Sequence, residues 1–298
     1  MRDATVGSLL VLAAATGFAT LPTFGKFAEA SGLTRPTLLF FRFTIGAIVV
    51  WSALWVRGEA TVLEGRELRA GVVLGVIYGG LSLAYFAGLS FLTASLTGIL
   101  FFTYPMYVFV LSAVFLKENV TLPRLGALGL AFVGVVLVIG IDSLRVHPMG
   151  VFFMTLAAIG YSIYTVGGRA MGASTNPRIL TAHLLVVTTA VIGLRWAQTG
   201  VAFPRTTFHW AIVLGIGTVG TGIPLLCYYE GLKRIEAIRV SILGTAEPVV
   251  TVVLGVTILG DTLAPTTIVG GVLVIGGVTI IQTSQRQRAW VLSKIGMA

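Results

Sequence analysis

Charged side chains are scarce in this chain of 298 residues, since only 10% are Asp, Glu, Lys or Arg and 56% are hydrophobic. So few charges cannot cover the surface of a water-soluble globule. The mean hydropathy of +0.97 therefore predicts an integral membrane protein. The single cysteine, Cys227, excludes an internal disulfide and is most simply a small apolar residue.

Sequence motifs of several enzyme classes are also missing. The chain contains no G-x-x-x-x-G-K-[ST] loop for nucleoside triphosphates, no H-E-x-x-H and no G-x-S-x-G. Its three histidines and one cysteine form no cluster along the sequence. We therefore expect no enzyme activity, no catalytic residues, no cofactor and no metal site.

Long apolar runs are what the sequence does contain. A helix needs about 20 residues to cross a hydrocarbon core roughly 30 Å thick. The first run is too long for a cleavable signal peptide and is not followed by an A-x-A-like site. We predict an all-α membrane protein with ten transmembrane helices. The ten runs are 6–28, 37–56, 70–91, 95–116, 123–141, 149–170, 179–199, 208–232, 237–259 and 265–284.

The basic residues between these runs are distributed unevenly. Fourteen Lys and Arg lie at the N-terminus, in alternate loops and in the C-terminal tail, against five in the remaining loops. Short positive loops stay in the cytoplasm, so both termini are predicted to be cytoplasmic. The net charge of +9 is explained by this topology, and no nucleic-acid partner is expected.

The two halves of the sequence resemble each other at a constant offset of 143 residues. This offset aligns AATGF with AAIGY, YFAGL with YYEGL, and Pro105 with Pro248. Because each half has five predicted helices, an odd number, the second copy enters the membrane in the opposite orientation. We predict two inverted five-helix repeats, 1–143 and 144–284, followed by a basic cytoplasmic tail, 285–298. Such repeats are common in secondary transporters, and one chain that holds both is expected to work as a monomer.

Glu247 is the acidic residue nearest the centre of an apolar run, and Tyr104 is its counterpart in the repeat. An acid at mid-membrane costs about 2.5–3.5 kcal/mol, so it should face protein or water. Pro105 and Pro248 each remove a backbone donor and kink their helices. We interpret Tyr104 and Glu247 as lining a cavity. The alternative is a neutral Glu247 that is hydrogen-bonded between helices.

Other polar and aromatic residues inside the runs are further candidates. Arg42 and His183 are candidates, with Glu247, for a charge or proton relay; otherwise Arg42 snorkels or pairs with Glu29, and His183 lies at the interface. The tyrosines predicted to form an aromatic wall, or else to pack the core, are Tyr78, Tyr161 and Tyr164. The predicted kinks or hinges are Pro22, Gly79, Gly80, Pro105, Gly167, Gly168, Pro224 and Pro248. Glu118 and Asp261, at matching positions, are expected to cap helix ends or loops.

Taken together, these features resemble the drug/metabolite transporter superfamily, EamA-type. The resemblance rests on the ten runs, on FRF in the second run, and on YPMYVFVLSAVFLKE and EPVVTVVLGVTILGD, each with a proline and a later acid. The segment GLSFLTASLTGILFFTYPMYV is most similar to bacterial exporters of aromatic and other amino acids, of the YddG type. The resemblance implies the bacterial inner membrane and an export cavity formed by runs 1, 3, 4, 6, 8 and 9. The cavity residues that it implies are Tyr78, Phe101, Tyr104, Tyr161 and Glu247.

Three functional classes come into question for such a chain: a transporter, a channel and a membrane enzyme. A channel needs a continuous polar pore lining, and these runs are too apolar for one. A membrane enzyme needs a catalytic set at one depth, and no such motif is present. We therefore expect a secondary active or facilitative transporter that exports amino acids or similar metabolites by alternating access. Other metabolites or drugs, or a channel-like pore, are the alternatives, and protons are a candidate coupling ion.

Overall fold

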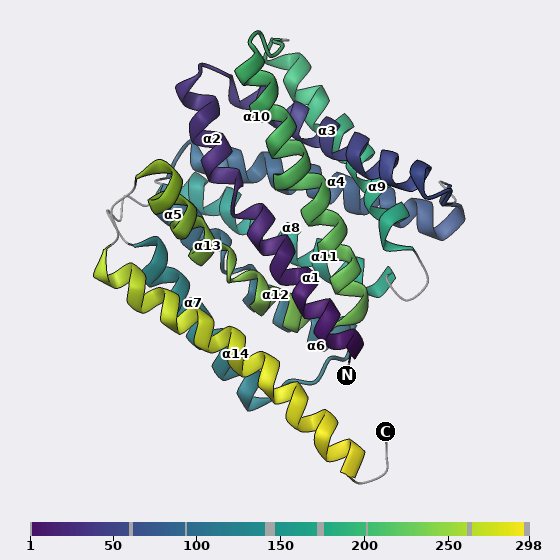
Figure 1. Ribbon diagram of the computed structural model, residues 1–298, viewed down its shortest axis with the longest axis vertical. Coiled ribbons are helices and arrows are strands. Elements are labelled where there is room, and N and C mark those ends of the chain that lie inside the picture. The colour runs from purple at the N-terminus through teal and green to yellow at the C-terminus, as the bar shows by residue number, and fades with distance from the viewer. Residues whose placement is uncertain are drawn as a thin grey trace.

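A computed structural model describes residues 2–59, 62–92, 94–140, 147–171, 176–200, 202–260 and 264–294, with backbone only at 2, 94, 95 and 282–294. All regular elements in this part of the chain are helices, as predicted (Figure 1). The predicted repeat boundary at 143/144, Asp261 and the last four residues of the predicted tail lie outside the described residues.

Nine helical stretches of the described chain are long and apolar enough to cross a membrane. They correspond to the first nine predicted runs. They are Asp3–Ala30, Arg35–Val56, Gly65–Leu89, Leu96–Phe115, Leu122–Ile139, Pro148–Met171, Pro177–Gln198, Thr207–Arg234 and Ala237–Leu259. The tenth run falls in a shorter apolar stretch, Pro265–Ile281. The protein is therefore an integral membrane protein.

Six of the ten stretches lie in uninterrupted helices. Their apolar residues lie all around the helix because one side meets protein and the other meets lipid. These helices are α3 (Arg35–Val56), α4 (Gly65–Leu89), α7 (Leu122–Ile139), α8 (Pro148–Met171), α9 (Pro177–Gln198) and α14 (Pro265–Lys294).

The other four stretches are broken near their middle. They comprise α1 (Arg2–Phe18) with α2 (Leu21–Ala30); α5 (Ala94–Phe101) with α6 (Tyr104–Phe115); α10 (Thr207–Gly217) with η1 (Thr218–Gly222) and α11 (Ile223–Arg234); and α12 (Ala237–Gly244) with α13 (Glu247–Leu254) and η2 (Gly255–Leu259). The helix after each break carries a proline in its first turn, where a missing N–H does no harm. These prolines are the predicted Pro22, Pro105, Pro224 and Pro248.

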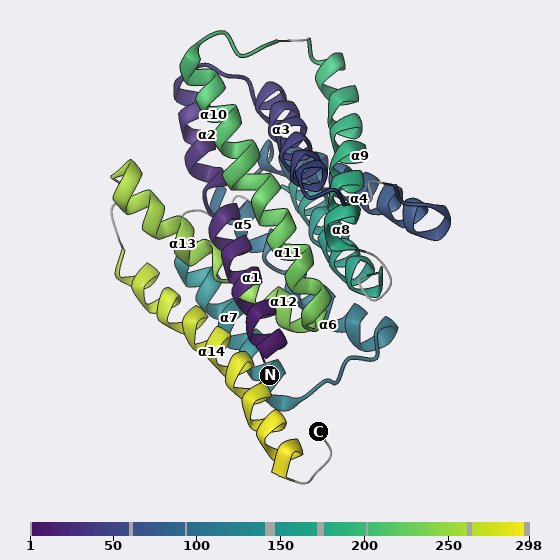
Figure 2. The same cartoon turned by 45° about the vertical axis from the view of Figure 1, so that its right-hand side comes forward.

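The main helix contacts join the two halves of the sequence. α1 packs against α11 as α8 packs against α4, α3 packs against α10 as α9 packs against α4, and α1 packs against α12 as α8 packs against α6. Helices that are counterparts of each other also pack together, α3 with α9, α6 with α12, and α7 with α14 (Figures 1 and 2). Exchanging each stretch for its counterpart 143 residues away gives the same set of pairs. The N-terminus and the C-terminal end of α14 lie at the same end of the bundle in both views.

Helices α7 and α14 approach each other closely at small residues. A Cβ atom added to Gly134 would lie 2.7 Å from the carbonyl oxygen of Gly270, and one added to Gly277 would lie 2.8 Å from that of Ala127. Ala127 precedes Gly134 along α7, and Gly270 precedes Gly277 along α14. The two helices are therefore antiparallel, and the two contacts are counterparts under the 143-residue offset.

Candidate functional site

A continuous cluster of aromatic rings lies where α4, α5, α6 and α8 meet. The ring of Tyr161 lies 4.6 Å from that of Tyr104 and 5.5 Å from that of Phe101, measured between centroids. Tyr78 stacks on Tyr164 at 4.7 Å, and Tyr164 lies 5.7 Å from Tyr161. The structure thus brings together all five aromatic residues that the sequence predicted for the cavity.

Burial divides these five residues into two groups. The side chains of Tyr164, Tyr104 and Tyr78 are 0%, 4% and 5% exposed, so they form a packed layer. Phe101 and Tyr161 are only half-buried and keep accessible surface. Of the five predicted cavity rings, Phe101 and Tyr161 are therefore the two with surface left for another contact.

Hydrogen bonds from neighbouring helices hold the packed layer in place. The Tyr104 hydroxyl donates to the carbonyl of Ser241 on α12 at 3.4 Å, and Ser162 Oγ donates to the carbonyl of Tyr104 at 3.0 Å. The Thr165 hydroxyl bonds the Tyr228 hydroxyl at 2.7 Å. The layer is thus fixed by contacts between elements from both halves of the sequence.

Glu247 is the first residue of α13 and directly follows the break in its transmembrane stretch. Its side chain is half-buried. Within the described residues, it accepts no hydrogen bond and forms no ion pair within 4.0 Å. It nevertheless lies within electrostatic range of Arg42 and of the hydroxyls of Tyr78, Tyr85 and Tyr104, and thus beside the aromatic cluster.

Arg42, on α3, is half-buried and does not pair with Glu29. Its Nε donates to Thr221 Oγ1 at 2.9 Å, and its guanidinium carbon lies 4.8 Å from the centre of the Phe43 ring. Thr221 belongs to the π-helical turn η1, and its hydroxyl donates to the carbonyl of Ile216. A π-turn changes the direction of its side chains, and here it presents a hydroxyl to the arginine.

His183 does not belong to this cluster. Its Nδ1 lies 2.9 Å from the carbonyl oxygen of Ile179, one turn earlier on α9, and its ring lies 5.2 Å from Trp51 of α3. The Trp51 indole N–H donates to the carbonyl of Ala182. His183 thus packs at the α3–α9 contact, and its relay role stays a prediction.

The four predicted glycine hinges lie inside uninterrupted helices. Added Cβ atoms would lie 2.8 Å from Val191 at Gly79, 3.0 Å from Leu74 at Gly167 and 2.6 Å from Tyr229 at Gly168, whereas Gly80 has open space. The sequence predicted kinks or hinges at these positions, but α4 and α8 continue through them. In this conformation, three of the four glycines permit close helix packing, and a hinge role stays a prediction.

Sequence reasoning did not select four residues that border the predicted set. They are Tyr85, Tyr228, Tyr229 and Thr221. Tyr85 lies 5.2 Å from Phe101, and Tyr228 and Tyr229 lie 6.0 and 5.4 Å from Tyr164. The aligned segments YFAGL and YYEGL pair Tyr85 with Tyr228, and this match in the sequence could have indicated these two tyrosines. Pro224 predicted a kink near this place, but not that the kink would be a π-turn that positions Thr221.

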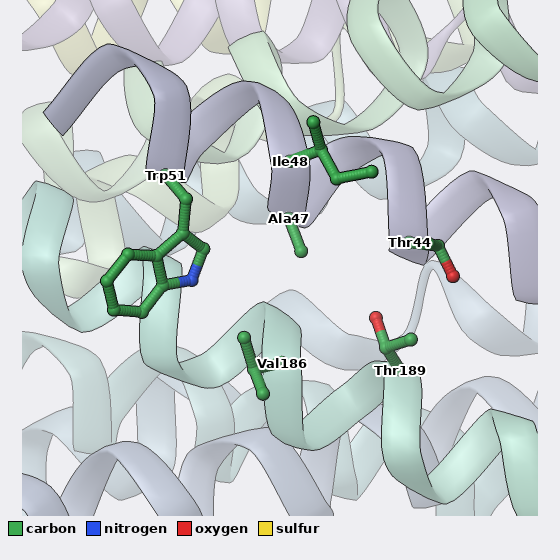
Figure 3. A pocket seen from close by; sticks show the side chains of 6 residues that line it. All are labelled: Thr44, Ala47, Ile48, Trp51, Val186 and Thr189. Atoms are coloured by element: carbon green, nitrogen blue, oxygen red, sulfur yellow. The ribbon is translucent and has the colours of Figure 1, made fainter. Parts of the chain in front are cut away.

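A groove of about 280 Å³ lies between α3 and α9, away from the aromatic cluster (Figure 3). Its lining is almost entirely apolar, and none of the predicted site residues contributes to it. Ile48 and Val186 are largely exposed at its rim, so the groove opens on the lipid-facing surface. Its lining residues are Thr44, Ala47, Ile48, Trp51, Val186 and Thr189.

Ion pairs connect several helices at the end of the bundle that holds the N-terminus. Arg178 pairs with Glu59 and with Glu230, and Arg234 pairs with Glu230 and with Asp3. Each partner comes from a loop or helix end, so the network ties together α1, α9, α11 and the segment after α3.

A second set of polar contacts lies at the same end. Arg124 pairs with Glu236, and Glu118 accepts hydrogen bonds from the backbone N–H groups of Ala237 and Ile238 at 2.8 and 3.0 Å. The predicted capping role of Glu118 is therefore confirmed: it caps the N-terminus of α12. No group of three or more metal-binding side chains occurs in the part of the chain that the structure describes.

Comparisons with known proteins agree with this architecture. The chain is 25% identical to the uncharacterized transporter YcbK of Bacillus subtilis (strain 168), over 97% of this chain and 95% of that one. It is 28% identical to the pseudopaline exporter CntI of Pseudomonas aeruginosa (strain UCBPP-PA14), over 72% and 74%. A solved crystal structure with 20% identity superimposes with a TM-score of 0.84, covering 95% of this chain and 98% of that one.

YcbK and CntI are named as a transporter and an exporter, and neither is named as an amino-acid exporter, so the narrower resemblance stays a prediction. The model of the EamA-like transporter family matches twice, at residues 5–140 and 148–283. The two matches cover nearly the whole chain and correspond to its two halves. The chain belongs to the EamA-like transporter family.

Proposed function

We propose that this membrane transporter exports amino acids, aromatic ones among them, or similar small metabolites. The observation that carries the proposal is the aromatic cluster: half-buried Phe101 and Tyr161 continue to Tyr85, which lies within electrostatic range of two opposite charges, Arg42 and Glu247. A molecule with an apolar side chain and a charged head matches such a lining.

Alternating access through two inverted repeats of five helices is the proposed mechanism. Three observations support it: the two family matches, the helix pairs that are unchanged when the halves are exchanged, and the antiparallel packing of α7 with α14. In carriers of this plan, the halves rock about a site near the membrane midplane. The breaks at Pro22, Pro105, Pro224 and Pro248 are the proposed hinges.

The orientation follows from the charges. With the basic loops in the cytoplasm, both termini and the ion pairs around Arg178 lie on the cytoplasmic face of the bacterial inner membrane. The repeats are 1–143 and 144–284, and the tail 285–298 is cytoplasmic. One chain supplies both halves of the site, so a monomer is sufficient.

Two energy sources are compatible with the site. Proton coupling needs a group that binds and releases a proton, and Glu247 is the candidate, with Arg42 and His183 as further relay residues. Facilitated export needs no such group. The resemblance of this chain to a protein named as a pseudopaline exporter supports export of a small molecule, and other metabolites or drugs are the second candidate substrates.

Transport by purified protein in liposomes tests the proposal. We expect saturable uptake of labelled aromatic amino acids into the liposomes, competed by unlabelled amino acids, without single-channel currents in planar bilayers. A panel that includes non-amino-acid metabolites measures the selectivity. Unitary currents indicate a channel, and the lack of uptake of every amino acid contradicts amino-acid export.

A further inference from the structure

We infer that Arg42 and Glu247 bind the two charged ends of a zwitterionic head group, the guanidinium holding the carboxylate and Glu247 holding the ammonium. The inference rests on the proposed function and deepens it, because it assigns a specific role to each residue. It also predicts that substrates which lack either charge bind more weakly.

Both residues lie near the middle of their transmembrane stretches. Glu247 is the eleventh of the 23 residues in Ala237–Leu259, and Arg42 is the eighth of the 22 residues in Arg35–Val56. At a rise of about 1.5 Å per residue, Arg42 lies roughly 5 Å from the midpoint of its helix. At this depth, water and lipid headgroups do not compensate a charge unless the protein provides an accessible polar space.

The two charges act on each other but are not in contact. Neither side chain forms an ion pair within 4.0 Å in the described part of the chain, although the two lie within electrostatic range of each other and of Tyr78 and Tyr85. Opposite charges in a low-dielectric region are costly to leave apart. Their separation, together with the accessible surface of both side chains, fits a third group that bridges them.

Two contacts hold the Arg42 guanidinium group without using its two terminal nitrogen atoms. Nε is occupied by Thr221, and the Phe43 ring lies against the guanidinium. This leaves Nη1 and Nη2, which form a planar pair of donors that matches the two oxygens of a carboxylate. Thr221 is itself held by the π-turn, since its hydroxyl donates to Ile216, so the arginine is oriented before a ligand arrives.

The half-buried rings define where the rest of the molecule lies. Tyr85 is influenced by both charges and lies 5.2 Å from Phe101, which in turn lies 5.5 Å from Tyr161. A head group between Arg42 and Glu247 therefore places its side chain on these three rings. The expected ligand is a zwitterion with a large apolar or aromatic side chain.

Three related probes test the assignment on purified full-length protein: L-phenylalanine, phenethylamine, which lacks the carboxylate, and 3-phenylpropionate, which lacks the amine. Equilibrium binding of each is measured for wild type, Arg42→Gln and Glu247→Gln. Arg195→Gln and Glu64→Gln make the same charge changes at exposed positions and are the matched controls. Elution as a single species in gel filtration reports folding.

Arg42→Gln is expected to weaken the binding of L-phenylalanine and of 3-phenylpropionate by about 10- to 100-fold and to leave the affinity for phenethylamine unchanged. Glu247→Gln is expected to weaken the binding of L-phenylalanine and of phenethylamine by a similar factor and to leave the affinity for 3-phenylpropionate unchanged. The unchanged probe in each case shows that the variant is folded. Arg42→Lys and Glu247→Asp should recover part of the loss.

Two results overturn the inference. Suppose that the wild type binds L-phenylalanine, but that each variant weakens the binding of all three probes equally or of none. The proposed function then stands, and the assignment of the two charges is wrong. If the wild type binds none of the three probes, the proposed function fails and the inference fails with it.

Discussion

Replacement of Gly134 by alanine measures how closely α7 and α14 pack. The added Cβ would lie 2.7 Å from both the carbonyl oxygen of Gly270 and the amide nitrogen of Val274. Both are backbone atoms of α14, so they cannot rotate away as a side chain can. Carbon and oxygen normally approach to about 3.3 Å, so the helices must separate locally by roughly 0.6 Å.

Gly129, on the same helix, provides the matched control, because an added Cβ there has no neighbour within 4 Å. Gly→Ala in a helix gains up to about 1 kcal/mol from propensity at either position. Overpacking costs about 1–3 kcal/mol only at Gly134. The difference between the two variants therefore isolates the clash and corresponds to roughly 2–10 °C in melting temperature.

Thermal unfolding of the purified protein in detergent, followed by tryptophan fluorescence, measures this difference. Gly270→Ala, whose Cβ would lie 2.6 Å from the Gly134 carbonyl, should behave like Gly134→Ala. The double variant should lose less than the sum, since one separation relieves both clashes. Equal melting temperatures for Gly134→Ala and Gly129→Ala would refute the close approach.

Three further predictions concern the site and the bundle end. Tyr161→Ala should lower transport at low substrate concentration by about three- to tenfold through the lost ring contact, whereas Ile163→Ala, on the exposed face of α8, should not. Glu247→Gln should abolish any stimulation by a pH gradient in liposomes; an unchanged rate and pH response would remove Glu247 from the mechanism. Burial raises the pKa of the Glu118 carboxyl against the two N–H bonds that favour its charge. Stability should therefore fall as pH rises from about 4 through that raised pKa, and Glu118→Gln should flatten this part of a melting-temperature profile.

The transmembrane stretches and their breaks were predictable because their causes are local. Apolar runs of about 20 residues follow directly from the thickness of the hydrocarbon core. Pro105 and Pro248 interrupt their helices because proline lacks an N–H and fixes φ, whatever surrounds it. The same reasoning located the breaks before Pro22 and Pro224.

The division of the site into accessible and packed residues was not predictable, because it depends on distant partners. Tyr161 and Tyr164 lie one turn apart on α8, yet only Tyr161 keeps accessible surface. Tyr164 is covered by Tyr78 and Tyr229 from other helices. Gly79 similarly suggested a hinge because glycine is permissive, but its small size serves contact with Val191, 112 residues later.

The kinds of contact between the halves differ from place to place, and this difference bears on how the bundle can move. At the end that holds the N-terminus, the halves meet through ion pairs such as Arg178 with Glu59 and through the bonds from α12 to Glu118. Such contacts exchange for water at a modest cost near a membrane surface. The contact of α7 with α14 has backbone against backbone at Gly134 and Gly270 and offers no such exchange. We therefore expect that the movement which opens the proposed substrate site breaks the polar contacts at this end of the bundle and leaves α7 and α14 in contact.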